Sequence, residues 1–422
     1  MWERLLEQLL GTIIREGTLH IVMPSGRKVT SGTGHPEVSL RITDPSLPRR
    51  IVRNPDLGMG EGYMDGGVEI ENDDLRGLLS IILTNIGKGR LHPIQRAHLK
   101  VGRPVRMLGQ WNPMSRSQRN VAHHYDLSSD LYDIFLDEDR QYSCAYFERD
   151  DDSLERAQLQ KKRHIAKKLL LEPGMDVLDI GCGWGGMALH LAREHGVRVT
   201  GVTLSSEQHA AAVERARAEG LSDLVTFRLQ DYRALDRPFD RIVSVGMFEH
   251  VGRPHFDEFF GKTRDLLTDD GVALIHTIGR TAPPGVTSPF ISKYIFPGGY
   301  CPSMSEMAAS IERQWLVSTD IEIWRLHYAK TLRHWDDRFV AGMDRARALY
   351  DDRFCRMWRF YLVASEQTFV HGRQVVFQAQ LARSKAAVPI TRDYMHPAPA
   401  PEVAAKGQTP ARRRRELVDA TS

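Results

Sequence analysis

The sequence predicts a doubly wound α/β unit, in which a parallel sheet lies between two layers of helices, preceded by a small α+β unit. Five apolar stretches with strand character alternate with helical stretches, which is the pattern of a parallel sheet. A glycine-rich turn follows the first of these strands directly, and such strand-to-helix turns commonly bind ligands. The predicted strands are residues 175–180, 197–202, 225–229, 241–245 and 272–277, with a helix at 205–219 among their connections.

Residues 1–95 form the predicted α+β unit. It begins with an amphipathic helix, because apolar side chains from Trp2 to Ile14 recur at helical spacing. The stretches 18–23 and 27–30 flank a Pro-Ser-Gly turn, which predicts a β-hairpin.

Two further features of this unit have alternative interpretations. The glycine-rich stretch 58–67 lacks the Lys-Ser/Thr ending of a phosphate-binding loop, so we interpret it as turns. The very apolar stretch 75–86 predicts a helix, which either packs in the core or offers a groove to lipid.

Composition and charge indicate the number of domains and the class of protein. A chain of 422 residues with 41% hydrophobic and 26% charged residues is a globular protein long enough for two domains. Its formal net charge is +3, and residues 403–422 carry five basic and two acidic side chains, 5 − 2 = +3. The body is therefore close to neutral and gives no support for nucleic-acid binding. We assign residues 96–122 to a linker, 123–390 to the α/β domain and 391–422 to a disordered basic tail.

The cysteine pattern and the apolar runs predict the compartment. Four widely separated cysteines without a CxxC pair favour neither a disulfide framework nor a zinc site. No run reaches the roughly 20 apolar residues of a membrane span, and the first residues lack a signal-peptide core. We therefore expect a cytoplasmic protein.

The turn after the first strand predicts the cofactor. Its glycines let the backbone approach a ligand closely, and their spacing departs from the G-x-G-x-x-G of dinucleotide sites. A carboxylate two residues before the first glycine can meet an ammonium group. This arrangement is typical of S-adenosylmethionine (SAM) sites and predicts a Rossmann-like class I SAM-dependent methyltransferase domain preceded by the α+β accessory domain. The cofactor-binding residues predicted here are Asp179, Gly181, Gly183 and Gly185.

Polar residues after the next two strands extend this site. Thr203 and Gln208 follow the second strand, where an acid commonly binds the ribose. Gln230 and Asp231 follow the third strand and are expected near the adenine, with a solvated turn as the alternative.

The reacting groups are expected at the same edge of the sheet. Glu249 and His250 follow the fourth strand, and His276 ends the fifth. Glu249 and His250 are adjacent in sequence, which disfavours a shared metal ion, so we expect no metal site.

Six motifs together resemble the cyclopropane-fatty-acyl-phospholipid synthases and their mycolic-acid relatives. The resemblance runs through nearly all of residues 120–380 and is much looser in the N-terminal unit. The motifs are YSCAY at 142–146, VLDIGCGWGG at 177–186, GVTLSSEQ at 201–208, MFEHVG at 247–252, HTIG at 276–279 and KYIFPGG at 293–299. The stretches HYDL at 124–127 and HYAKTL at 327–332 are also similar to the family.

The resemblance implies a reaction and its residues. In this family a cis alkene attacks the sulfonium methyl group, and loss of a proton from the new methyl closes a cyclopropane ring. A bicarbonate ion acts as the base. Carried over by motif, bicarbonate would be held by Cys144, Glu249, His276, the backbone of Ile278, and Tyr328, and the cofactor would also contact Tyr142 and Ser143. Cys144 as a buried small side chain is the alternative to a polar contact.

The family chemistry also needs aromatic faces for the cation and a dry site. Phe147, Phe248 and Tyr294 are the aromatic candidates, with core packing as the alternative for each. A helix within residues 123–133 is expected to close over the cofactor.

The expected partners are unsaturated phospholipids at the inner face of the membrane, with a possible homodimer through the N-terminal unit. A sibling activity that stops at a methyl or methylene branch, and a non-catalytic carrier of lipid and cofactor, are the alternatives.

Overall fold

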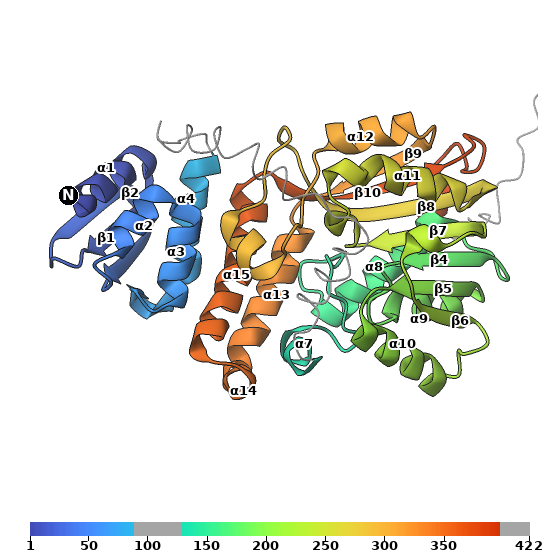
Figure 1. The fold of residues 1–422 in the computed structure, drawn as a ribbon, viewed down its shortest axis with the longest axis horizontal. Helices are drawn as coiled ribbons and strands as arrows, with labels where there is room; N and C mark the ends of the chain where they lie inside the picture. Colours follow the sequence, from blue (N-terminus) through green and yellow to red (C-terminus); the bar gives the residue numbers. More distant parts are fainter. Residues whose placement is uncertain (88–128, 397–422) are drawn as a thin grey trace, which may run out of the picture.

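The computed structural model describes residues 1–87 and 129–396 (Figure 1). The predicted linker 96–122, residues 123–128 of the predicted closing helix, and residues 397–422 of the predicted tail lie outside these ranges. Within them, no helix is long and apolar enough to cross a membrane.

The N-terminal part is an α+β unit built around a small antiparallel sheet. The long strand β2 bends back on itself, so that both of its halves pair with β1. The predicted hairpin is present, with its turn closed by the Met23 amide donating to the Arg27 carbonyl at 2.8 Å. The elements are α1 (Trp2–Ile13), β1 (Glu16–Val22), β2 (Lys28–Ile42), α2 (Leu47–Arg53), α3 (Pro55–Met64), β3 (Val68–Ile70) and α4 (Leu75–Gly87).

The expectation that residues 58–67 form turns is wrong for most of that stretch, because α3 runs through its first seven residues. Asn54 caps this helix by accepting a hydrogen bond from the Leu57 amide, and Pro55 occupies the first helical position. The glycines permit close packing: a Cβ at Gly58 would lie 2.8 Å from the Arg50 backbone, and one at Gly60 would lie 2.3 Å from the Phe290 ring.

The larger part is an α/β unit with a seven-stranded sheet in the order β6-β5-β4-β7-β8-β10-β9. The strands β4 to β8 are parallel to their neighbours in this group, and they confirm the five predicted strands and the predicted α/β fold. The strands are β4 (Asp176–Ile180), β5 (Arg198–Thr203), β6 (Val225–Leu229), β7 (Phe239–Val245), β8 (Leu267–Arg280), β9 (Val317–Trp324) and β10 (Gln374–Ala382).

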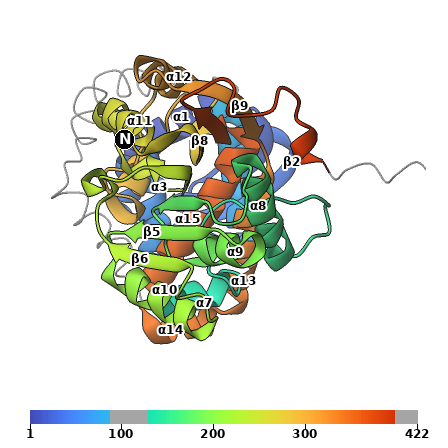
Figure 2. The same ribbon diagram turned by 90° about the vertical axis from the view of Figure 1, so that its right-hand side faces the viewer.

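Two layers of helices cover the sheet, each with its own apolar core. The helices α8, α9 and α10 pack on one face around Ile165, Leu189 and Ala212, and α11 and α12 pack on the other around Phe259 and Met307. Figure 2 shows the sheet with α8, α9 and α10 around it. The bounds are α8 (Leu154–Leu169), α9 (Gly186–His195), α10 (Ser206–Ala218), α11 (Phe256–Asp265) and α12 (Met304–Arg313).

Beyond β9 the chain forms helices that join the two parts. The helix α15 packs against α13 and, on its other side, against α3 and α4 (Figure 1). One apolar core therefore contains both Leu79 of α4 and Trp358 of α15. The helix predicted at 75–86 thus packs in a core. The helices are α7 (Ser129–Phe135), α13 (His327–Ala341), α14 (Met343–Leu349) and α15 (Asp352–His371).

Candidate active site

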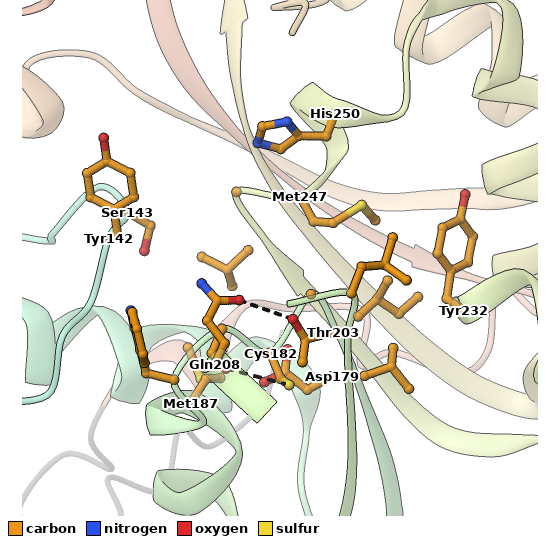
Figure 3. Close-up of a pocket in the computed structure, with 18 of the residues that line it drawn as sticks. Tyr142, Ser143, Asp179, Cys182, Met187, Thr203, Gln208, Tyr232, Met247 and His250 are labelled. Carbon is orange, nitrogen blue, oxygen red and sulfur yellow. Dashed lines mark hydrogen bonds between the residues drawn. The ribbon is translucent and has the colours of Figure 1, made fainter. Parts of the chain in front are cut away.

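A pocket opens at the carboxyl edge of β4, β5, β6 and β7 (Figure 3). The loops that follow these strands form most of its wall, and the loop that contains Tyr142 forms the opposite side. Nine of the ten residues predicted to bind the cofactor line it: Tyr142, Ser143, Asp179, Gly181, Gly183, Thr203, Gln208, Gln230 and Asp231.

In the glycine turn the backbone itself lines the pocket, at a position where neighbouring atoms leave no room for a side chain. Gly181 has a φ of +80°, and a Cβ there would lie 2.7 Å from the side chain of Met247. Gly185 is the predicted residue that does not line the pocket. It precedes α9 with a φ of +85°, and a Cβ there would lie 2.7 Å from the Phe227 ring, so this glycine serves helix–strand packing.

Asp179 is the buried carboxyl group at the base of the pocket. Its Oδ2 has no hydrogen-bond partner among the described residues. Burial raises the pKa of Asp179 to about 7, against the opposing effect of Lys161. An unpaired buried carboxylate is costly, and a ligand ammonium group would relieve that cost. The residues at this end of the pocket therefore fit the amino-acid portion of SAM.

Thr203 and Gln208 form a fixed pair at the end of β5. The Thr203 hydroxyl donates to Gln208 Oε1 at 3.1 Å (Figure 3), and it accepts from the Ser205 amide at 3.2 Å. Ser205 in turn caps α10 by accepting from the Gln208 amide. The pair is held by the start of this helix, which keeps both polar side chains at the pocket.

Gln230 and Asp231 line the pocket after β6, but their side chains already have protein partners. Gln230 donates to the Ala234 carbonyl at 3.3 Å. Asp231 accepts from the Arg233 amide at 3.0 Å and pairs with its guanidinium at 2.7 Å. Their side chains thus stabilise the turn that borders the pocket.

The loop that contains Tyr142 and Ser143 is anchored from below by α8. The ammonium group of Lys161 donates to the side-chain oxygens of Gln141 and Ser143, both at 2.8 Å. The amide of Gln158 donates to the backbone carbonyls of the same two residues. Burial lowers the pKa of Lys161 to about 8. Sequence reasoning missed Lys161 because a lysine within a polar helix resembles a surface residue.

The helix α7 borders this loop. Its Tyr132 ring lies 5.4 Å from the ring of Tyr142 and 6.0 Å from that of Trp184 in the glycine turn. Tyr142 also stacks on Trp335 at 5.1 Å, and its hydroxyl lies 2.9 Å from the hydroxyl of Tyr361. The described part of the predicted closing helix therefore contacts the cofactor loop directly.

None of the five predicted bicarbonate ligands lines the pocket itself. Glu249 itself does not line the pocket, although Met247 and His250, on either side of it in the chain, do. Glu249 Oε1 accepts from the Ile278 amide at 2.7 Å. Its Oε2 is buried and has no hydrogen-bond partner in the described chain, and burial raises the pKa of Glu249 to about 7. The Ile278 amide thus holds the carboxyl group.

Two of the other three ligands share one apolar cluster, and the third is linked to it. Cys144 and Tyr328 belong to the same cluster as Ile278 and Trp324, and the His276 ring lies 5.1 Å from the Trp324 ring. Burial lowers the pKa of His276 well below its ordinary value and raises that of the Cys144 thiol. The imidazole and the thiol are therefore both neutral, which makes each a hydrogen-bonding group for a ligand.

The three aromatic candidates pack against other side chains. Phe248 is fully buried among aromatic rings of α11, 4.5 Å from Phe256. Phe147 stacks on His334 at 5.6 Å. The Tyr294 hydroxyl donates to Glu61 at 2.8 Å. Core packing is thus the alternative that the structure favours for Phe248.

Further pocket residues were not singled out from the sequence. They are Arg140, Trp184, Met247, Tyr232 and His255, which lie beside the predicted ones in the lining. Trp184 carries the clearest signal, because it lies inside the glycine motif that predicts the cofactor site; its side chain is buried in the apolar core that also contains Tyr132.

Comparison with known proteins identifies the family. The sequence pattern described as "Mycolic acid cyclopropane synthetase" matches residues 113–379, which is more than half of the chain. The chain belongs to this family. With the fold described above, it is a SAM-dependent methyltransferase.

Two relatives are similar in sequence over most of the chain. It is 40% identical over 350 residues to "Cyclopropane-fatty-acyl-phospholipid synthase" of Escherichia coli (strain K12), covering 82% of this chain and 88% of that protein. It is 35% identical over 379 residues to "Probable fatty acid methyltransferase" of Pseudomonas putida, covering 86% and 92%.

A solved structure matches the larger part. The crystal structure of the mycolic acid cyclopropane synthase CmaA1 complexed with SAH and CTAB has a TM-score of 0.60 and 35% sequence identity. The match covers 64% of this chain and 99% of that one. That protein binds SAH, the demethylated form of SAM, in the same fold.

Proposed function

We propose that this enzyme transfers a methylene carbon from SAM to the cis double bond of an unsaturated phospholipid acyl chain and forms a cyclopropane ring, with bicarbonate as the base. SAM supplies an electrophilic methyl group when bound. The residues of the chain bind the two substrates, exclude water and hold the base. The observation that carries the proposal is the carboxyl group of Glu249, in which one oxygen is anchored by the Ile278 amide and the other is buried with no partner among the described residues.

Asp179 supports the cofactor part of this proposal. Its unpaired Oδ2 and a pKa of about 7 leave it able to pair with the ammonium group of SAM at neutral pH. Tyr142 and Ser143 close the opposite side of the pocket. With Lys161 and Gln158 fixing their loop, these residues orient the cofactor before the alkene arrives.

The electrostatics around Glu249 support a bicarbonate ion. Two anions side by side would repel one another unless a proton lies between them. The unpaired Oε2 and the pKa of about 7 suit a carboxyl group that shares a proton with bicarbonate. The neutral His276 can donate one hydrogen bond to such an ion. The neutral Cys144 thiol donates to the Ala145 carbonyl at 3.3 Å and would have to turn from it to donate to the ion.

Family membership and the 40% identical relative named "Cyclopropane-fatty-acyl-phospholipid synthase" support the proposed lipid substrate. We place the enzyme in the cytoplasm, bound peripherally to the inner membrane face, where the Arg-rich segment 412–415 would favour anionic lipid. A homodimer through the N-terminal unit completes the proposal and is tested by analytical ultracentrifugation.

The experiment uses purified protein, vesicles of cis-unsaturated phospholipid, bicarbonate and SAM with a trideuterated methyl group. Mass spectrometry of the acyl chains should find two deuteriums in each modified chain, because ring closure removes one. Proton NMR of the unlabelled product should show a cyclopropane rather than its methylene-branched isomer. Omission of bicarbonate should slow the reaction.

A methyl branch is the second candidate, favoured by the match to the protein named a probable fatty acid methyltransferase. It predicts three retained deuteriums. No incorporation with retained binding of lipid and SAM would instead favour a non-catalytic carrier.

A further inference from the structure

We infer that Gln378, oriented by Lys168 and Glu322, is a positioning residue that fixes the proton of His276 on Nε2. This inference deepens the proposed function, because a donor at Nε2 is what a bicarbonate ion would need from His276.

The register of the sheet places three of these residues in one row. Gln378 of β10 lies directly opposite His276 of β8 on one side and Glu322 of β9 on the other. Because side chains alternate along a strand, directly opposed residues share one face of the sheet. A slip of one residue would replace the amide of Gln378 by the ring of Phe377. The antiparallel insertion of β10 therefore determines what His276 meets.

The fourth residue, Lys168, comes from the helix α8. Lys168 is fully buried, and its ammonium group donates to Gln378 Oε1 at 2.9 Å and pairs with Glu322. Glu322 also lies 2.7 Å from His164 Nε2. The pairing lowers the pKa of Glu322 to about 2, so Glu322 is ionised and holds the ammonium group in place.

Lys168 decides which way the Gln378 amide points. A lysine side chain donates hydrogen bonds and accepts none when it is charged. The ammonium group of Lys168 must therefore face the side-chain oxygen of Gln378. If it faced the NH₂ group instead, two hydrogen-bond donors would point at each other. The NH₂ group of Gln378 then points to His276, where Nε2 of the amide lies 3.0 Å from the imidazole Nδ1.

The tautomer of His276 follows from this orientation. The imidazole is neutral because burial lowers its pKa, with a contribution from Lys161 and Lys168. A neutral imidazole carries one proton, and the nitrogen that accepts from Gln378 cannot carry it. The proton is therefore on Nε2. If His276 accepted a hydrogen bond from bicarbonate through Nε2, its proton would have to be on Nδ1 instead.

Nitrogen-15 NMR of the full-length protein labelled at histidine tests the inference. The His276 signals are assigned by their loss in His276→Gln. In the wild type, Nδ1 should have the shift of an unprotonated nitrogen. In Gln378→Glu the carboxylate accepts hydrogen bonds only, so Nδ1 should move to the shift of a protonated nitrogen. Gln380→Glu is the matched control, because Gln380 lies two residues along the same strand, is equally buried and bonds the Lys168 backbone.

A protonated Nδ1 in the wild type would overturn the inference, as would an unchanged Nδ1 in folded Gln378→Glu. An equal shift in Gln380→Glu would also overturn it, because the effect would then come from general disturbance of β10. Should Gln378→Glu fail to fold, Lys168→Met serves instead and should give a mixture of the two tautomers.

The labelling experiment above separates this inference from the proposed function. An unprotonated Nδ1 without cyclopropane product would leave the tautomer assignment standing and remove the proposed reaction. A cyclopropane product with a protonated Nδ1 would do the reverse. If both hold, Gln378→Leu should lower kcat by about 10-fold or more with little change in the KM for SAM, by analogy with loss of a group that orients a ligand.

Discussion

The proposed chemistry depends, at the residue scale, on two carboxyl groups, Asp179 and Glu249. Burial raises the pKa of each to about 7, and each keeps one oxygen without a partner among the described residues. Their surroundings differ. Asp179 lines the pocket, whereas Glu249 does not line it and has one oxygen fixed by the Ile278 amide. Asp179 is therefore suited to pairing with the ammonium group of SAM, and Glu249 to sharing a proton with bicarbonate.

Replacing Glu249 by Gln tests the second role. The variant keeps the shape and the hydrogen bond from Ile278 but cannot accept a proton, so turnover should fall on the order of 10²-fold. Binding of SAM, measured by calorimetry, should persist. A variant with full activity would show that the base site lies elsewhere.

Replacing Asp179 by Asn tests the first role through affinity and stability together. Loss of the ion pair with the ammonium group should weaken SAM binding by roughly 10- to 100-fold, from about 1–3 kcal/mol per charged hydrogen bond. Without cofactor the variant should be the more stable protein at pH 7, because it no longer buries an unpaired carboxyl group.

The pH dependence of that stability has a definite sign. A carboxyl group whose pKa is raised on folding binds its proton more tightly in the folded state, so its contribution is lost as pH rises from about 4 to about 7. The free energy of unfolding of Asp179→Asn should therefore exceed that of the wild type increasingly over this range. Denaturant titrations at several pH values measure it, and a constant difference would contradict the raised pKa.

At the scale of elements, α3 shows how glycine can serve a helix. Intrinsic preference disfavours glycine in helices by about 1 kcal/mol relative to alanine, which is why the sequence predicts turns there. Glycine is nevertheless needed at positions 58 and 60, because α2 and the Phe290 ring approach the helix too closely for any side chain.

A pair of glycine-to-alanine variants tests this explanation. Gly60→Ala would place a Cβ 2.3 Å from the Phe290 ring, and the strain should destabilise the protein by about 1–3 kcal/mol. Gly11→Ala in α1 has nothing within 4 Å and should stabilise it by about 0.5–1 kcal/mol. Denaturant unfolding measures both, and a stabilised Gly60→Ala would refute the packing argument.

At the scale of the whole molecule, the contact of α15 with α3 and α4 joins the N-terminal unit to the catalytic part. Arg76 of α4 donates to Asp336 at 2.7 Å and to Glu366 at 2.9 Å, and both carboxylates are buried. A buried ion pair that loses one partner leaves an uncompensated charge.

Arg76→Met should therefore destabilise the protein by about 2–4 kcal/mol. Arg353→Met is its control, because Arg353 pairs with Asp65 across the same contact in an exposed position and should cost about 0–1 kcal/mol. Thermal unfolding and limited proteolysis compare the two. Equal effects would mean that burial of the pair is unimportant.

The basic segment 403–422 gives a prediction that rests on charge alone. Its deletion removes a net charge of +3 and should weaken binding to anionic vesicles at low salt, since each basic residue near such a surface contributes about 1 kcal/mol. Cosedimentation with vesicles measures this, and neutral vesicles are the control. Unchanged binding would exclude a membrane role for the segment.

Local motifs predicted much of the fold and of the pocket. Each parallel strand is a short apolar run, and ligand residues follow at the carboxyl ends of these strands, so Asp179, Thr203 and Asp231 could be assigned to one edge from sequence. The strands β9 and β10 were not predicted, because Glu322, Gln378 and Gln380 interrupt their apolar pattern. Gln378 and Gln380 are fully buried, and Glu322 is partly buried, only because β10 enters the sheet between β8 and β9.

The sequence by itself determined the family, the parallel sheet and the glycine turn that lines the pocket, since these depend on residues close together in the chain. Only the tertiary structure decided which charges are buried and what they meet. Lys161 and Lys168 resemble surface lysines in a polar helix, yet both are buried and donate hydrogen bonds to fixed partners. The reason is physical: burial and pairing arise between distant segments, 210 residues apart for Lys168 and Gln378, and no local pattern contains that information.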